Sequence, residues 1–142
     1  MIDLLPVISL WNPWAMWVAL GWKKIETRTH VRFQSLTGRR IGIHASRRWD
    51  DHWREAASVY LDVEQIARTE ANQTHWRGGI VVCTADVHAF SMLRPEHAGD
   101  ALIECDTLRW GLYLSNVKET RFPQVPIKGG QGIFYVPRDL CA

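Results

Sequence analysis

The residues with the clearest potential for chemistry lie in one basic segment. Between Lys23 and Arg48 there are eight basic side chains and a single acid, Glu26, which gives this segment a formal charge of +7. The whole chain carries +2, so the remainder carries −5. Such uneven charge is typical of a protein that binds a polyanion. The alternative is that the cations are unrelated side chains on different solvated faces. The eight basic residues of the segment are Lys23, Lys24, Arg28, Arg32, Arg39, Arg40, Arg47 and Arg48.

Glu26 is the most informative of these residues because it is the lone acid among cations. Side chains alternate along a strand, so Lys24, Glu26 and Arg28 are expected on one face and Thr27 on the other. A carboxylate there can accept hydrogen bonds from the amino edge of a base. It can also form a structural ion pair with Lys24 or Arg28, and both roles can hold together. Lys23 is a candidate phosphate contact or, if desolvated, a general base, unless it is simply an exposed lysine at a helix end.

Further side chains can add stacking and hydrogen bonding to a nucleic-acid site. Trp11 lies just before the first expected helix, where its free face can stack on a base, a contact worth about 1–3 kcal/mol. The Arg28 guanidinium can bind a phosphate with two parallel hydrogen bonds, or it can form a structural contact within the protein. For His44 a structural role is favoured over a ligand contact. The turn containing Lys128 and Gly129 lets backbone approach a phosphate closely, or is a plain turn. The remaining candidates are Asn12, Ser46, Arg47 and Trp110.

Composition narrows the class of protein. A chain of 142 residues with 46% hydrophobic and 23% charged residues is ordinary for one globular domain, which we expect to span residues 1–142. Three cysteines without C-x-x-C or Cys/His spacing support neither a disulfide framework nor a zinc site, and we expect no metal and no cofactor. No signal peptide or membrane-spanning stretch is evident, so we expect a cytoplasmic protein that does not interact with a membrane. P-loop, dinucleotide, G-x-S-x-G and H-E-x-x-H motifs are missing.

The elements that must position these residues are short strands and two main helices. Asn12 is expected to cap a helix over residues 13–20 that Pro13 opens and Gly21 ends. This helix is apolar nearly all round, which indicates burial on more than one side. A second helix is expected over 50–69, the stretch 91–108 is irregular, and strands are expected over 7–10, 24–29, 39–45, 80–90, 110–117, 121–125 and 132–136. The pattern predicts an α+β protein with a small barrel or curled sheet, and closure would bury the strand edges.

Several phrases resemble the motifs of one family, in the family's order. ISLWNPWA (8–15), GWKKIETR (21–28), GRRIGIHA (38–45) and PIKG (126–129) resemble motifs of ASCH domains in the PUA-like superfamily, most closely the activating signal cointegrator-type branch. The resemblance extends over essentially the whole chain. It implies a small PUA-like β-barrel of about six strands, with two main helices flanking a cleft, and a role in binding nucleic acid.

The resemblance also implies an enzymatic alternative. Some bacterial ASCH proteins similar in the G-x-K region are amidohydrolases that act on acylated cytidine, such as N4-acetylcytidine, through a Lys, a Thr and a Glu, and others are ribonucleases. In this chain the lysine falls on Lys23, but the threonine position holds Glu26, and Thr27 is one step along. The expected nucleophile is therefore missing. A metal-independent ribonuclease needs only an acid and a base, which Lys23, Glu26 or His44 can supply.

Binding therefore ranks ahead of catalysis. We expect a module that holds single-stranded RNA or DNA, or a modified nucleoside, in a basic, aromatic-lined cleft, with an affinity that falls steeply as salt increases. If the chain neither retains nor turns over nucleic acid, a protein-interaction role replaces both readings.

Overall fold

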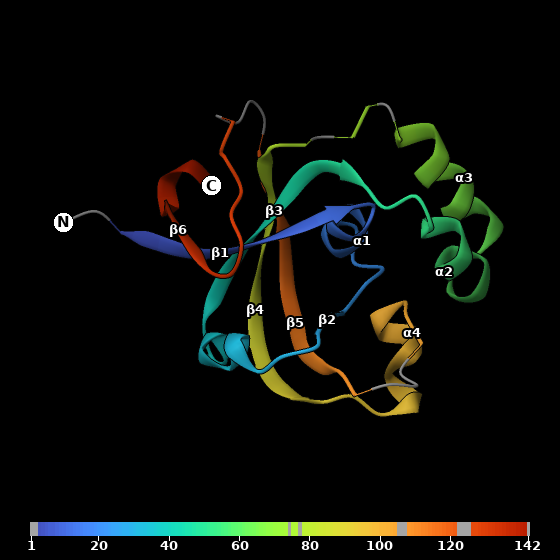
Figure 1. Ribbon diagram of the computed structural model, residues 1–142. Coiled ribbons are helices and arrows are strands. Elements are labelled where there is room, and N and C mark those ends of the chain that lie inside the picture. Colours follow the sequence, from blue (N-terminus) through green and yellow to red (C-terminus); the bar gives the residue numbers. More distant parts are fainter. Residues whose placement is uncertain (1–2, 74, 77, 105–107, 122–125, 142) are drawn as a thin grey trace.

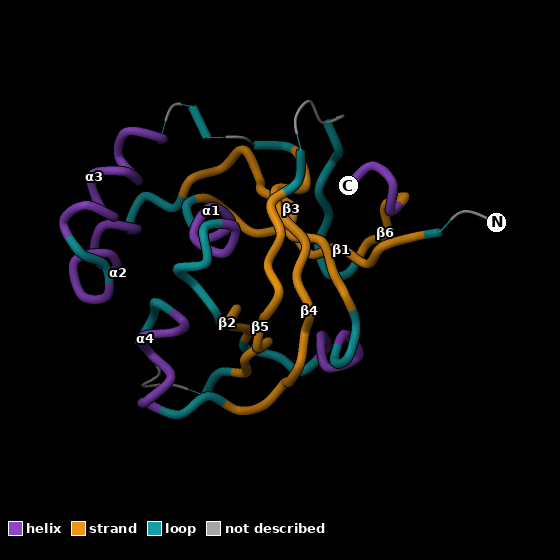
Figure 2. Tube along the Cα trace, turned by 180° about the vertical axis from the view of Figure 1, so that it is seen from behind, coloured by secondary structure: helices purple, strands orange, loops and turns teal. Residues whose placement is uncertain are grey.

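One mixed sheet organises the chain. The computed structural model describes residues 1–142 except 1–2, 74, 77, 105–107, 122–125 and 142. Within the described residues, the strands are β1 (Leu4–Asn12), β2 (Ile25–Arg28), β3 (Arg40–Trp49), β4 (Ile80–Met92), β5 (Trp110–Glu119) and β6 (Phe134–Pro137). Their order across the sheet is β2-β5-β4-β3-β1-β6 (Figures 1 and 2). β1 and β3 run parallel, and the other neighbours are antiparallel.

The sheet is strongly curved but open. The α+β prediction is confirmed, whereas the expectation of a closed barrel is wrong, because β2 and β6 lie at opposite ends of the strand order and do not pair. Both edge strands have only four residues. Short edges are one way in which a sheet avoids pairing with other chains, so closure is not required for that purpose.

The first helix, α1 (Trp14–Ala19), fills the hollow of the sheet, as Figure 1 shows. Ala15 and Val18 belong to the core cluster shared with the sheet, whereas Trp17 packs with Trp53 in a second cluster. The expected burial on more than one side is thus confirmed.

The start of α1 differs from the sequence prediction. Asn12 stays in β1 as the pairing partner of Trp49, and its amide Nδ2 donates to the Ser46 carbonyl at 3.2 Å. No side chain caps the helix; Pro13 occupies the cap position after a cis Asn12–Pro13 peptide bond. The prediction was wrong because strand pairing holds Asn12 in place.

The end of α1 is as predicted and positions the functional segment. Gly21 has a left-handed φ of 80°. The Gly21 amide donates to the Val18 carbonyl at 3.0 Å and the Trp22 amide to the Trp17 carbonyl at 2.8 Å, which together form a Schellman motif. The Lys23 amide also donates to the Trp17 carbonyl, at 3.0 Å. Lys23 is therefore tied directly to the helix end, ahead of β2.

The helices between residues 53 and 101 lie at one side of the sheet in both views, whereas the 3₁₀ turns at Arg32–Leu36 and Arg138–Cys141 lie at the other side (Figures 1 and 2). The predicted helix over 50–69 is two helices, α2 (Trp53–Tyr60) and α3 (Val63–Asn72). They separate because Leu61 is extended and Asp62 caps α3 in a capping box with Gln65.

The stretch over 91–108, expected to be irregular, contains the short helix α4 (Ala98–Ala101). The strand expected over 121–125 falls almost wholly outside the described residues. No helix in the described part of the chain is long and apolar enough to cross a membrane.

We predict that Gly21→Ala lowers the free energy of unfolding by about 1–2 kcal/mol, because an L side chain is strained at this φ. A β-carbon at Gly21 would meet no atom within 4 Å, so steric contact plays no part. Gly99→Ala is the matched control, since that site is equally open but has no positive φ. Urea denaturation of both variants measures the difference; equal effects would contradict the role given to Gly21.

Candidate functional site

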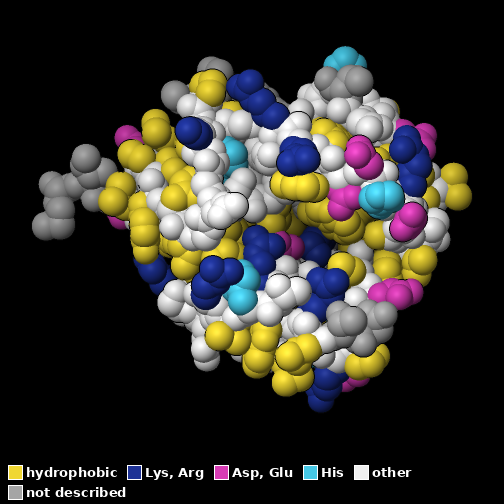
Figure 3. Space-filling view, viewed as in Figure 1, with side chains coloured by type: hydrophobic (Ala, Val, Ile, Leu, Met, Phe, Trp, Pro, Cys, Tyr) yellow, Lys and Arg dark blue, Asp and Glu magenta, His cyan; other side chains and the backbone are white. Residues whose placement is uncertain are grey.

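A basic cleft of about 1130 Å³ opens on the face of β1 and β3. Figure 3 shows a hollow on this side of the molecule, with Lys and Arg side chains gathered around and within it. The loop over 126–133 forms one wall, and the segment after β2 forms another. The lining residues are Ser9, Trp11, Arg28, His30, Arg32, Phe33, His44, Ser46, Arg47, Gly79 and residues 126–133.

A smaller cavity of about 390 Å³ adjoins the cleft. Ser9, Trp11 and Arg28 line both spaces, so they form the threshold between them. The volume is near the lower end of the range for small-molecule sites. The other lining residues of this inner cavity are Leu10, Trp14, Lys23, Glu26, Thr27, Asp50 and Ile103.

The sheet register explains why these side chains meet. Ser9 on β1 pairs with His44 on β3 in the parallel ladder. Because alternate residues of a strand share a face, Trp11 and Ser46 lie on the same side as this pair. Ile8 and Ile43 face the opposite side, where they join the hydrophobic core.

The charge of the cleft has one sign. Four cations line it, namely Arg28, Arg32, Arg47 and Lys128, and no acidic residue is among the described lining residues. Within the described part of the chain, Arg32, Arg47 and Lys128 form no ion pair with an acid. The charges of these three residues therefore face the cleft without a neutralising acid, whereas Arg28 is paired with Glu26.

The basic segment recognised in the sequence does not form a single patch. Arg40 bridges to Asp86 at 2.9 Å and to Thr84 at 2.8 Å across β3 and β4, outside both cavities. Lys24 and Arg39 are exposed elsewhere. The alternative of separate faces thus applies to these three cations, whereas Lys128 joins the cleft from a distant part of the sequence.

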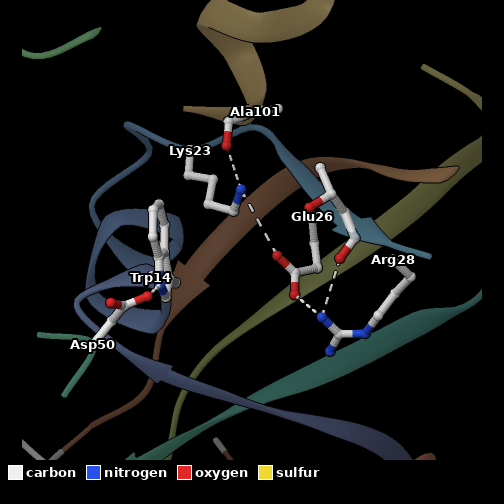
Figure 4. A network of polar contacts seen from close by, with 7 residues as sticks. Trp14, Lys23, Glu26, Arg28, Asp50 and Ala101 are labelled. Carbon is white, nitrogen blue, oxygen red and sulfur yellow. Dashed lines mark hydrogen bonds and ion pairs between the residues drawn. The ribbon is translucent and has the colours of Figure 1, made fainter. Parts of the chain in front are cut away.

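Glu26 lies at the centre of a buried polar network (Figure 4). The Lys23 ammonium is 3.8 Å from Glu26 Oε1 and also donates to the Ala101 carbonyl. The Arg28 guanidinium donates to Glu26 Oε2. Lys23 is only 3% exposed and Glu26 4%. Strand alternation favoured Lys24 as a partner, but Lys24 is exposed; the turn at Gly21 brings Lys23 to the carboxylate instead.

Two further residues of the inner cavity were missed by sequence reasoning. The Trp14 indole N–H donates to Asp50 Oδ2 at 3.2 Å, and the Lys23 ammonium lies 5.4 Å from the centre of the Trp14 ring. Trp14 belongs to the apolar helix expected over 13–20, and the expected burial of that helix gave no sign of a polar contact. Asp50 is held by its amide, which donates to the Asn12 carbonyl at 2.7 Å, and no short-range pattern indicates that contact.

His44 is buried, with 2% exposure, and both ring nitrogens have partners. Nε2 lies 2.7 Å from the Ile127 carbonyl oxygen and Nδ1 lies 2.9 Å from Ser9 Oγ. A carbonyl only accepts, so Nε2 carries the proton and Ser9 donates to Nδ1. Burial lowers the pKa of His44, and the hydrogen bond to Ile127 opposes part of that shift. Ser9 was missed, although its spacing of two from Trp11 places both on one strand face.

The predicted site residues are distributed as follows. Seven line the cleft: Trp11, Arg28, His44, Ser46, Arg47, Lys128 and Gly129. Lys23 and Glu26 line the inner cavity. Asn12 is fully buried beneath the cleft, and Trp110 stacks on Phe90 with ring centres 5.8 Å apart, so neither lines a cavity. No group of three His, Cys, Asp or Glu residues able to hold a metal occurs within the described ranges.

Known structures resemble this chain in fold. No protein-family model and no curated protein matches its sequence. The crystal structure of ASCH from Zymomonas mobilis aligns over 95% of this chain and 89% of that one, with a TM-score of 0.55 and 15% identity. The chain has the fold of an ASCH domain. A tyrosine-to-phenylalanine variant and a serine-to-alanine variant of the Zymomonas protein each give a TM-score of 0.56 at 16% identity, covering 95% of this chain and 91% or 89% of theirs. The likeness concerns the ASCH fold in general and does not distinguish the cointegrator-type branch.

We predict that His44 makes stability depend on pH. The unfolded histidine, with a pKa near 6.5, binds a proton more readily than the buried one. The free energy of unfolding is therefore highest above pH 6.5 and falls as pH decreases from 7 to 5. Thermal or urea unfolding should show a shallower dependence for His44→Gln. The exposed His75→Gln serves as control; equal slopes for His44→Gln and the unmodified chain would contradict this prediction.

We also predict that Glu26→Gln destabilises the fold by about 3–5 kcal/mol, because it removes the buried carboxylate that pairs with both the Lys23 ammonium and the Arg28 guanidinium. The double variant Lys23→Met with Glu26→Gln removes both charges and should recover part of that loss. Urea denaturation measures both. A cost below about 1 kcal/mol for Glu26→Gln would show that the pair behaves as an exposed one.

Proposed function

We propose that the chain binds nucleic acid, with a preference for single-stranded RNA or DNA, in the basic cleft. One observation carries the proposal: four cations line the cleft, and no described lining residue is acidic. Attraction to phosphates supplies most of the affinity of such a surface and makes it sensitive to salt. The fold adds a general precedent, since the structural neighbours are ASCH proteins.

Trp11 supplies the stacking surface of the proposed site. Its side chain is 46% exposed and lies at the threshold of both cavities. The Arg48 guanidinium lies 4.4 Å from its ring centre and covers part of the ring. An aromatic ring held by a cation while still exposed can stack on an unpaired base. Bases in a duplex are already stacked, which favours a single strand.

The inner cavity suits recognition of a base edge. The carboxylates of Glu26 and Asp50 both line it. Each ionised carboxylate has about four acceptor positions, and the internal hydrogen bonds do not use all of them. The remaining positions can accept hydrogen bonds from an exocyclic amino group of a base or a modified nucleoside.

The geometry favours binding over the ribonuclease and amidohydrolase alternatives built on Lys23 and Glu26. The Lys23 ammonium is engaged by the Ala101 carbonyl and by Glu26, and Glu26 is also held by Arg28. A general base needs a free lone pair within reach of the substrate proton. Lys23 would have to leave its present contacts before acting as a base.

Fluorescence anisotropy with labelled single-stranded RNA, single-stranded DNA and duplex DNA, between 50 and 200 mM salt, tests the proposal. Trp11→Ala is expected to weaken single-strand binding by about 1–3 kcal/mol. Arg47→Ala and Lys128→Ala should each weaken binding to all sequences and reduce the salt slope by about one. Arg39→Ala removes an exposed cation of the same segment outside the cleft, and should have little effect.

Absence of binding at 50 mM salt would overturn the proposed function. An equal loss of affinity in Arg39→Ala and Arg47→Ala would show that net charge binds the ligand, without the cleft. Strand cleavage abolished by Glu26→Gln would replace the binding module with a nuclease.

A further inference from the structure

A serine and a histidine meet inside the cleft in an arrangement that binding alone does not require. Ser9 and His44 lie directly opposite each other on β1 and β3. The Ser9 hydroxyl donates to His44 Nδ1 at 2.9 Å, and His44 Nε2 donates to the Ile127 carbonyl at 2.7 Å. The carbonyl fixes the tautomer and ring orientation, so that the Nδ1 lone pair faces the hydroxyl. Ser9 as nucleophile, His44 as base and the Ile127 carbonyl as orienting group thus form one chain of hydrogen bonds.

The imidazole is suited to accept the hydroxyl proton. His44 is buried, and burial lowers its pKa, so the ring is neutral near pH 7. The Ser9 side chain is only partly buried and lines both the cleft and the inner cavity. A substrate in either space therefore reaches the oxygen, while the base lies behind it.

Backbone of the 126–133 loop lies against the pair. A β-carbon at Gly129 would be 3.0 Å from Ser9 Oγ and 2.7 Å from His44 Cε1, so a larger residue does not fit without a shift. The backbone amides from Lys128 to Gln131 donate to no acceptor among the described residues. A free backbone amide beside a nucleophile can stabilise the negative oxygen that forms during acyl transfer, and Gly129 is the residue of this loop that approaches Ser9.

We propose that Ser9 is the nucleophile of a second function, hydrolysis of carboxylic esters, with His44 as general base and the Ile127 carbonyl as the positioning group. Ser9 Oγ bonds to the ester carbonyl carbon while its proton passes to His44 Nδ1. The carbon–oxygen bond to the alcohol then breaks, and His44 returns the proton to the leaving alkoxide. Water then attacks the carbonyl carbon of the acyl-serine and gives a proton to His44 Nδ1; the bond between that carbon and Ser9 Oγ breaks, His44 passes the proton to Ser9 Oγ, and the carboxylic acid leaves.

The charge of the cleft selects the class of ester. The four lining cations favour an ester whose alcohol part carries phosphate, such as an acylated nucleotide. Leu10, Ile103 and the ring of Trp11 give the inner cavity apolar surface for a small acyl group. This choice of substrate rests on the proposed function, whereas the acyl-transfer chemistry rests on the Ser9–His44 pair alone.

A fluorophosphonate probe, which forms a stable bond to an activated serine, tests the chemistry on the intact protein. Mass spectrometry should find one adduct per chain, located on Ser9 and lost in Ser9→Ala. His44→Gln should label at least about 100-fold more slowly. Ser115→Ala is the matched control: Ser115 Oγ lies 3.2 Å from His88 Nδ1, outside both cavities, so labelling should be unchanged. Hydrolysis of 4-nitrophenyl acetate and of an acetyl ester of adenosine monophosphate should follow the same order of variants, with the nucleotide ester preferred.

No adduct on Ser9, or equal labelling of heat-denatured protein, would overturn the inference. If His44→Gln does not fold, Ser9→Ala still decides the outcome. The two proposals fail separately, because the adduct is measured on the unmodified chain without nucleic acid, whereas RNA binding is judged from the unmodified chain and from Arg47→Ala and Lys128→Ala. An adduct on Ser9 without nucleic-acid binding would keep the esterase and overturn the proposed function together with the choice of substrate.

Discussion

The parallel pairing of β1 with β3 is the constraint on which the rest of the site depends. It places Ser9 opposite His44 and sends Trp11 and Ser46 to the same face of the sheet. A shift of one residue in either strand would send the cleft side chains into the core and bring core residues to the surface. Because Ile8 and Ile43 are fully buried on the other side, the hydrophobic effect fixes the register. Core packing thus determines which polar groups meet in the cleft.

The second determinant is the short connection from α1 to β2. A helix end, a left-handed glycine and four edge-strand residues deliver Lys23, Glu26 and Arg28 to one point. Buried charges are costly unless each has a partner, and here two cations share one carboxylate. Asp50 is a second carboxylate in the inner cavity, so the formal charges there cancel and the excess positive charge lies in the outer cleft. The network thus holds the local fold together, while Arg32, Arg47 and Lys128 determine the sign of the potential in the cleft.

Sequence reasoning recovered local features and missed those that arise from distant contacts. The end of α1 at Gly21, the approximate positions of the six observed strands and the burial of α1 followed from residue type and spacing. The open sheet did not, because strand order depends on pairings between remote segments. Asn12 was taken as a helix cap because nothing local reports its pairing with Trp49. Asp50 was missed for the same reason, and the cleft receives Lys128 from a loop far along the chain.

The threshold shared by the two cavities has a consequence for selectivity. Ser9, Trp11 and Arg28 line both the outer cleft and the inner cavity. A ligand in either space therefore lies beside residues that also border the other space. A stiff polyanion can contact only the cations of the outer cleft. A flexible strand that turns one base out of its stack can fill the outer cleft and the inner cavity together. Discrimination would then come from the bending freedom of the ligand. If the cleft binds nucleic acid as proposed, it distinguishes ligands by how easily one unit leaves the stack of bases, in addition to their composition.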